Sequence, residues 1–421
     1  MVYKTYDCKT FRVHTIKTNK FKTCHMKIVF SKEISIKTLS ADSMLCDMLS
    51  FVSSKYKTRK DFVIHSEELY KASFLGLVGR YGNVLNTSYV LDFINPEFIN
   101  SNNYLEDVIK FPFEMIQNPL VENDEFDEKS FKIIKDRLLK DIDSIKEIPS
   151  KIACKKALEL MDKDSPSSLL VSGTKEDVLK ITPASLYEHY KKFFKDHVCN
   201  IFIIGSVDMD YVVKLIKKYF QNRIINDTPI DFFVNNKLAK KSKIVFEDSG
   251  NVQANIIMIY NIKDLTKEER DVSFYVYNYI LGNGGLNSKL YKKIRMENSL
   301  CYSINSIYLK YDKLLLIQIS LDTENVKKAY TLVKKCISSM AHGDFSEEDI
   351  ENAKSNLGQA LLMSQDNNIA ITNNYIFHIL DDFPRIDRRT ELYNKVTKKQ
   401  IVDVAKKLRL NTIFVLNGEK K

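Results

Sequence analysis

Two side chains that donate strong, directed hydrogen bonds, Arg295 and Tyr302, lie close together in a glycine-rich part of the chain. A guanidinium is always charged and holds its donors in a fixed fork, while a phenol donates a single hydrogen bond. Each residue also has an ordinary explanation. An arginine near a helix end is usually solvated or balances the helix dipole, and a tyrosine in a strand usually packs within a sheet. The surrounding elements therefore decide whether the two meet.

Three glycines, Gly282, Gly284 and Gly285, follow one predicted helix and precede another. The first helix opens with a capping box at residues 266–269 and continues through an apolar run at 272–281. Gly282 is a usual helix-ending residue, so the stretch is predicted to form a hinge-like loop between regular elements. Because glycine lacks a side chain, such a loop could let a peptide approach the backbone closely, or it could simply end a helix.

A second helix and a strand are predicted to bring Arg295 and Tyr302 together. Asn287 or Ser288 can cap this helix, whose apolar side chains point inward and whose end carries Arg295. From residue 301 onward, larger side chains alternate with smaller or polar ones, which indicates a strand. Arg295 and Tyr302 could therefore meet across a helix-to-strand turn.

Length and composition bound the class of protein. The chain has 421 residues, of which 44% are apolar and 11% aromatic, and this predicts at least two folded domains with sizeable cores. The net charge of +10 comes from 64 basic and 54 acidic residues, and the lysine pairs are spread along the chain. No concentrated basic stripe is present, so nucleic-acid binding is not expected. The charge favours at most a mild preference for acidic or peptide-like partners.

Cysteine usage and hydropathy predict a cytoplasmic protein. The seven cysteines are odd in number, widely spaced and form no CxxC motif, as expected for free thiols in a reducing compartment. The N-terminus lacks the apolar region of a signal peptide. No uncharged apolar run approaches the roughly 18 residues that span a bilayer. We therefore expect a soluble chain without a membrane span.

Two pairs of similar segments in the sequence indicate a tandem duplication. The stretch from Ile181 to Gly205 is echoed by the stretch from Val396 to Leu416. The stretch that opens at Phe126 is echoed by the one that opens at Phe345, with nearly the same offset along the chain. Two pairs of similar segments, in the same order and with nearly equal separations along the chain, predict two copies of a domain of about 200 residues.

The expected fold class is α+β, with two homologous domains that each consist of a mixed β-sheet covered by helices. The predicted boundaries are an N-terminal domain at 1–221, a polar linker at 222–242 and a C-terminal domain at 243–421 that carries the Arg/Tyr pair.

The duplication and the motifs together resemble the insulinase (pitrilysin) family of zinc metallopeptidases, the inverzincins, and in particular its processing-peptidase branch of short two-domain chains. The run from Leu281 through Arg295 to Ser303 carries the resemblance, and the stretches 173–183 and 204–208 support it. The likeness covers residues from about 10 to 418. It implies that each domain is one part of a clamshell half around a peptide chamber.

The zinc site of that family is missing from this chain. Active members bind zinc through an H-x-x-E-H helix, in which two histidines ligate the metal, the glutamate activates a water, and a later glutamate completes the site. The corresponding helix here has Met44 and Met48 at the histidine positions and Asp47 at the base position. The later ligand would fall within 125–132, where the alignment does not select a residue. No two of the seven histidines lie four residues apart, so we predict no catalytic zinc in this chain and no autonomous peptidase with unusual ligands.

Arg295 and Tyr302 match the residues with which family members contact the substrate backbone and stabilise the tetrahedral intermediate, and Gly282, Gly284 and Gly285 belong to the same substrate-binding motif. The resemblance therefore implies the non-zinc subunit of a paired bacterial peptidase, which does not hydrolyse peptides alone. Its partners would be a peptide substrate and a homologous zinc-bearing subunit. In bacterial relatives such pairs are associated with the maturation of ribosomally made peptides by leader removal, or with pathways that modify translation factors. The alternative is an inert structural or binding pseudo-peptidase, like the core subunits of respiratory complexes that share this fold.

Overall fold

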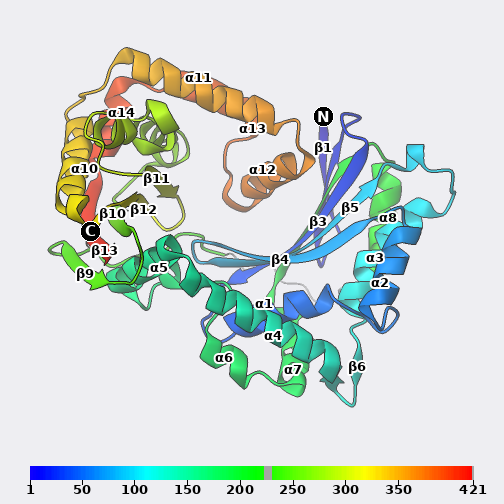
Figure 1. The fold of residues 1–421 in the computed structure, drawn as a ribbon. Helices are drawn as coiled ribbons and strands as arrows, with labels where there is room; N and C mark the ends of the chain where they lie inside the picture. The colour runs from blue at the N-terminus through cyan, green and yellow to red at the C-terminus, as the bar shows by residue number, and fades with distance from the viewer. Residues whose placement is uncertain (222–229, 420–421) are drawn as a thin grey trace. The chain divides into compact units, whose positions relative to one another are not determined.

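A computed structural model describes residues 1–221 and 230–419 of the chain (Figure 1). It divides into two compact units. Unit 1 contains Met1–Asp143, Leu169–Asp231 and Asp366–Ile376, and unit 2 contains Ser144–Ser168, Phe232–Gln365 and Phe377–Lys421. Within the predicted linker, residues 222–229 lie outside the described residues. In the described part of the chain, no helix is both long and apolar enough to cross a membrane.

Unit 1 is built on a six-stranded mixed sheet with the order β1-β2-β8-β3-β5-β4. Alternate side chains of β3 (Met26, Ile28 and Phe30) are buried against helices in one apolar core, as the period-two pattern of the strand requires. The strands are β1 (Val2–Asp7), β2 (Arg12–Lys17), β3 (Thr23–Glu33), β4 (Ser73–Tyr81), β5 (Val84–Ile94) and β8 (Val198–Gly205), with a small β6 (Val121–Glu122) and β7 (Glu125–Phe126) hairpin. The helices are α1 (Leu39–Leu49), α2 (Arg59–Glu68), α3 (Tyr104–Gln117), α4 (Glu128–Ser144), α6 (Lys175–Lys180), α7 (Pro183–Asp196) and α8 (Met209–Tyr219).

Unit 2 is built on a five-stranded sheet with the order β9-β13-β10-β12-β11. All nine residues of the central strand β10 are buried, so both faces of this sheet need a cover. The strands are β9 (Lys243–Asp248), β10 (Ala254–Ile262), β11 (Ser303–Leu309), β12 (Leu314–Leu321) and β13 (Leu408–Asn417). The α-helices are α5 (Pro149–Asp162), α9 (Phe274–Asn278), α10 (Val326–Ala341), α11 (Glu347–Ser364), α13 (Ile386–Asn394) and α14 (Lys398–Lys406).

The two sheets share one topology. In unit 1, β2 pairs in parallel with β8, and β8-β3, β3-β5 and β5-β4 pair antiparallel. In unit 2, β9 pairs in parallel with β13, and β13-β10, β10-β12 and β12-β11 pair antiparallel. The same five-strand pattern therefore occurs twice, and strand β1 is an addition to unit 1. This confirms the predicted duplication and the α+β class.

Helix α5 comes from the first half of the sequence but belongs to unit 2. Ala153, Ala157 and Met161 on one side of α5 are buried and pack with β10 and β13 in a separate apolar cluster. Small alanine side chains let a helix lie close to a sheet, where dispersion contacts are strongest. α5 therefore covers the second face of the unit 2 sheet (Figure 1).

Helix α12 (Asn368–Asp381) is the counterpart of α5 in the second half of the sequence. It follows α11 at the same spacing, start to start, at which α5 follows α4. Its first part, up to Ile376, belongs to unit 1, and Phe377–Asp381 belong to unit 2. In unit 1, Asn373 accepts a hydrogen bond of 3.0 Å from Lys27, and the ring of Tyr375 stacks on Tyr3 at 4.5 Å. Each unit thus contains one helix from the other half of the sequence.

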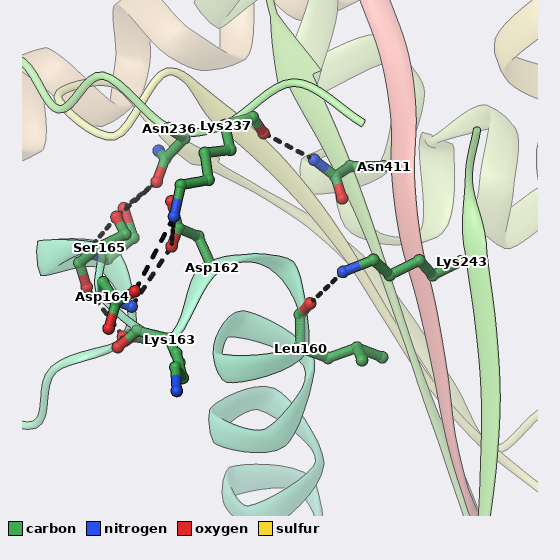
Figure 2. A network of polar contacts seen from close by, with 11 residues as sticks. Leu160, Asp162, Lys163, Asp164, Ser165, Asn236, Lys237, Lys243 and Asn411 are labelled. Atoms are coloured by element: carbon green, nitrogen blue, oxygen red, sulfur yellow. Dashed lines mark hydrogen bonds and ion pairs between the residues drawn. The ribbon is translucent and has the colours of Figure 1, made fainter. Parts of the chain in front are cut away.

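The described end of the predicted linker is held within unit 2 by a polar network around Asn236 (Figure 2). The Oδ1 atom of Asn236 accepts hydrogen bonds from Ser165 (2.6 Å) and Ser167 (3.2 Å). Its Nδ2 atom donates to the backbone oxygen of Asp312 at 2.7 Å. One amide therefore joins the turn after α5 to the β11-β12 connection.

The neighbouring Lys237 extends this network (Figure 2). Its ammonium lies 3.1 Å from the carboxylate of Asp162 at the end of α5, and its carbonyl accepts a hydrogen bond of 3.1 Å from Asn411 of β13. On the adjacent strand β9, Lys243 donates to the carbonyl oxygen of Leu160 at 3.0 Å. The C-terminal end of α5, where helical carbonyls lack internal partners, is thereby fixed to the sheet.

We expect Asn236→Ala to lower the free energy of unfolding by about 1–2 kcal/mol, because the substitution removes three hydrogen bonds from a half-buried site. The adjacent Asn235 is exposed and accepts a hydrogen bond from Lys313, so Asn235→Ala is the matched control, with an expected change within about 0.5 kcal/mol. Urea unfolding of both variants measures the difference. Equal effects would show that Asn236 does not anchor this segment.

Candidate functional site

The glycine motif is more ordered than the sequence predicts. The first helix runs from Glu269 through a π-helical turn at Tyr279–Asn283, so Gly282 lies inside the last turn and not in a loop. Gly282 is buried, and a Cβ atom there would lie 2.7 Å from the hydroxyl oxygen of Ser306. Close packing against β11 therefore explains this glycine. The expected hinge-like loop is shortened to the residues that follow.

Gly284 and Gly285 form the connection between the two helical segments. A Cβ atom on Gly284 would lie 2.7 Å from the carbonyl oxygen of Tyr279, whereas Gly285 has a φ of +59° and open space around its Cα. A left-handed backbone conformation favours glycine at the exposed position 285. The role of these glycines in peptide binding stays a prediction, since packing and backbone geometry already account for them.

The structure brings Arg295 and Tyr302 together across the expected turn. Ser288 precedes the second helical segment, the π-helical Tyr291–Met296, and its hydroxyl donates to the carbonyl of Gly285 at 2.7 Å. Arg295 near the end of this segment is exposed, and its guanidinium donates to the backbone oxygen of Tyr302. Short π-helical segments are rare and often occur at functional sites.

Tyr302 is held at both ends by strand β12 and its continuation. Its backbone N–H donates to the carbonyl of Ser320 at 2.8 Å, and its hydroxyl donates to the carboxylate of Asp322 at 2.9 Å. The side chain remains 45% exposed, so its ring is accessible to a ligand. Nothing in the sequence connects Asp322 with Tyr302, because the two residues are distant along the chain. The pairing of Ser303 with Ser320 in the β11-β12 ladder brings the two together.

The neighbouring Cys301 is not a candidate nucleophile. Burial raises the pKa of its thiol to about 11, although the charge of Arg295 opposes the shift. A thiol with such a pKa carries almost no thiolate at neutral pH. The pair therefore offers hydrogen-bond donors to an anionic oxygen, and the adjacent thiol adds no nucleophile.

The predicted remnant of the zinc site lies on α1 in unit 1. Met44 and Met48 are 0% and 2% exposed and belong to the main apolar core of that unit. Asp47, at the base position, forms an ion pair of 2.7 Å with Arg137 of α4. The sequence does not identify Arg137 as this partner, because nothing in the spacing of α4 shows which of its residues faces α1. An arginine next to this carboxylate opposes the binding of a metal cation there.

One turn earlier, α1 is anchored by a buried carboxylate. Asp42 is fully buried, and it accepts hydrogen bonds from Lys32 (2.7 Å) and His189 (2.8 Å). Burial alone would raise the pKa of Asp42, but the bond from His189 and the charge of Lys32 outweigh it and hold the pKa below its ordinary value. This cluster fixes α1 to β3 and α7. Within the described ranges, no group of three or more histidine, cysteine, aspartate or glutamate side chains could hold a metal ion.

The chain is similar to several known proteins in sequence and in fold. Residues 180–357 match the family described as Peptidase M16 inactive domain. The chain is 24% identical over 358 residues to the "Probable inactive metalloprotease YmfF" of Bacillus subtilis, covering 84% of this chain and 83% of that protein. It is 24% identical over 201 residues to the "Non-peptidase homolog YmxG" of Helicobacter pylori, covering 45% and 44% of the two chains. A crystal structure of a conserved protein from Enterococcus faecalis V583 has the same fold, with a TM-score of 0.92, 22% identity and coverage of 100% and 99%.

The fold and the comparisons thus define a metallopeptidase-like chain, and two of its relatives are named inactive or non-peptidase. The match at residues 180–357 and the similarity to YmfF over 84% of the chain agree with the predicted resemblance to the insulinase-type metallopeptidases.

We expect the purified chain to retain only substoichiometric zinc after incubation with the metal and gel filtration, because methionine thioethers are poor zinc ligands and Asp47 is paired with Arg137. Elemental analysis by mass spectrometry checks this, with a chain that carries H-x-x-E-H as the positive control. One tightly held zinc ion per chain would mean that α1 is not the remnant of the zinc helix.

The stability of the fold at acid pH should depend on the buried His197. Burial lowers the pKa of His197 from 6.5 to about 3, so the unfolded chain binds a proton between these pH values that the folded chain does not. Stability must fall as the pH drops from 6.5 towards 3. His197→Phe should reduce this slope by up to about 1.4 kcal/mol per pH unit, measured by urea unfolding at several pH values. The exposed His342 supplies the control variant His342→Gln, and an unchanged slope in His197→Phe would refute the assignment.

Proposed function

We propose that this chain is the zinc-free subunit of a heterodimeric, cytoplasmic processing metallopeptidase. A homologous subunit with an H-x-x-E-H helix supplies the zinc and the hydrolytic water. Arg295 and Tyr302 of this chain bind the peptide and stabilise the transition state in trans. The substrate class is a peptide that matures by proteolytic processing, such as removal of a leader.

The single observation that carries this proposal is the exposed, mutually ordered pair of Arg295 and Tyr302. The contact with the Tyr302 carbonyl orients the guanidinium but uses only part of its five-donor fork. The Tyr302 hydroxyl is directed by Asp322 and exchanges that partner for a substrate oxygen when a peptide binds. Donors that are already oriented lose little on binding the charge that develops in a transition state.

The remnant on α1 explains why a partner is needed. Met44 and Met48 supply core packing where family members place zinc ligands, and Arg137 neutralises Asp47. This chain therefore retains one part of the family's catalytic apparatus and lacks the other. A zinc-bearing homologue has the complementary part.

The alternative is a catalytically inert scaffold that binds other proteins. One observation favours it: both donors have partners within the chain, Arg295 at the Tyr302 carbonyl and Tyr302 at Asp322. A purely structural turn would show the same contacts. The two functions differ in whether removal of the donors changes turnover or only stability.

We expect Arg295→Ala, and separately Tyr302→Phe, to lower kcat of the assembled pair by on the order of 10²-fold, with complex formation unchanged. Steady-state peptide hydrolysis at saturating zinc-bearing partner measures this, and gel filtration measures assembly. Lys293→Ala is the matched control, because Lys293 lies on the same helical segment, is exposed and forms its ion pair with Glu297. Unchanged turnover in both variants would favour the scaffold.

A further inference from the structure

Strand β9 is an uncovered edge of the unit 2 sheet. Among the described strands it pairs only with β13, so its other side has no strand neighbour there (Figure 1). The equivalent strand of unit 1, β2, pairs in parallel with β8 on one side and antiparallel with the additional strand β1 on the other. Unit 1 therefore shows that this topology accepts one more antiparallel strand, at a position that no described strand fills in unit 2.

β9 exposes two large apolar side chains at this edge. Ile244 and Phe246 point to one face and are 44% and 53% exposed. Lys243, Val245 and Glu247 point to the other face, towards α5, where Val245 packs at the margin of the α5 cluster. An edge strand with exposed large apolar side chains and no proline is a template for pairing with another strand.

We propose that β9 pairs antiparallel with β9 of a second copy of this chain, about a two-fold axis at Val245. The first five of the six residues of the strand, Lys-Ile-Val-Phe-Glu, are complementary to themselves when the order is reversed. In this register Val245 lies opposite its own copy, Ile244 lies opposite Phe246, and Lys243 lies opposite Glu247. Apolar side chains therefore face apolar ones, and opposite charges face each other, across one symmetric interface.

By the same rules, neighbouring registers pair side chains that are less complementary. A two-fold axis perpendicular to the sheet places side chains that point to the same face opposite each other. Odd-numbered residues therefore stay opposite odd-numbered residues when the register changes. Moving the axis to Phe246 would place Ile244 opposite Asp248 and Val245 opposite Glu247. Each of these pairs sets a carboxylate against an apolar side chain, with loss of hydration and no compensating partner.

The charged residues of β9 already have partners on α5 and can accept another. Lys243 donates to the carbonyl of Leu160 at 3.0 Å, which uses one of its three N–H donors (Figure 2). Glu247 forms an ion pair with Lys156 and is 45% exposed, so its carboxylate has room for a second cation. Both side chains are thus held on the face where the cross-strand partner would arrive.

Charge reversal tests the proposal on the full chain. We expect concentration-dependent dimers of the natural chain in sedimentation velocity. Lys243→Glu and Glu247→Lys should each weaken dimerisation by at least about ten-fold, because each sets like charges opposite each other twice. An equimolar mixture of the two variants should regain the dimer, since every cross-strand charge pair is then of opposite sign. Circular dichroism and melting curves establish that each variant is folded.

Disulfide trapping gives a second readout that does not depend on charge. In the proposed register, Val245→Cys places two thiols on directly opposite residues, within the Cα separation that a disulfide spans. The exposed Ser242 lies three residues from the axis, so Ser242→Cys leaves its two copies about 20 Å apart and is the matched control. We expect mild oxidation to cross-link only the Val245→Cys chain.

A chain that stays monomeric at all concentrations, or a dimer that is indifferent to both single reversals, would overturn the proposal. Equal cross-linking at positions 242 and 245 would overturn the register. The inference does not rest on the peptidase function, because none of these measurements requires a zinc-bearing partner.

Discussion

The central constraint on this structure is that the unit 2 sheet has two apolar faces. β10 is buried at every position, and one layer of helices covers only one of its faces. Helix α5, from the other half of the sequence, covers the second face through Ala153, Ala157 and Met161. The network at Asn236 and Lys237 then fixes the end of α5 beside the sheet, so the burial of one strand determines where a distant helix and the described end of the linker must lie.

The position of the Arg/Tyr pair follows from that sheet. Tyr302 is fixed by β12 through the carbonyl of Ser320, and Asp322 just beyond β12 directs its hydroxyl. Gly282, inside the preceding helix, packs so closely on Ser306 of β11 that no side chain fits between them. The motif that resembles a family signature is thus also a packing unit, because Gly282 and Tyr302 both fix it to the sheet.

The duplicated fold and the contact between Arg295 and Tyr302 could be predicted from the sequence. The similar segments that open at Phe126 and Phe345 predicted a duplication, because the start of a capped helix is a local sequence signal. The matching strand orders of the two sheets confirm this duplication. The encounter of Arg295 with Tyr302 also depends on local elements. The exchange of α5 and α12, and the partners Arg137 and Asp322, could not be predicted, because each depends on contacts between residues that are distant in sequence.

The most direct test of the proposed function is peptide hydrolysis by three samples: this chain alone, a homologous chain that carries H-x-x-E-H alone, and the two mixed. We expect activity only in the mixture, because the zinc ligands and the Arg295/Tyr302 donors would reside on different chains. Full activity of the zinc-bearing chain by itself would contradict the proposal and leave this chain as a scaffold.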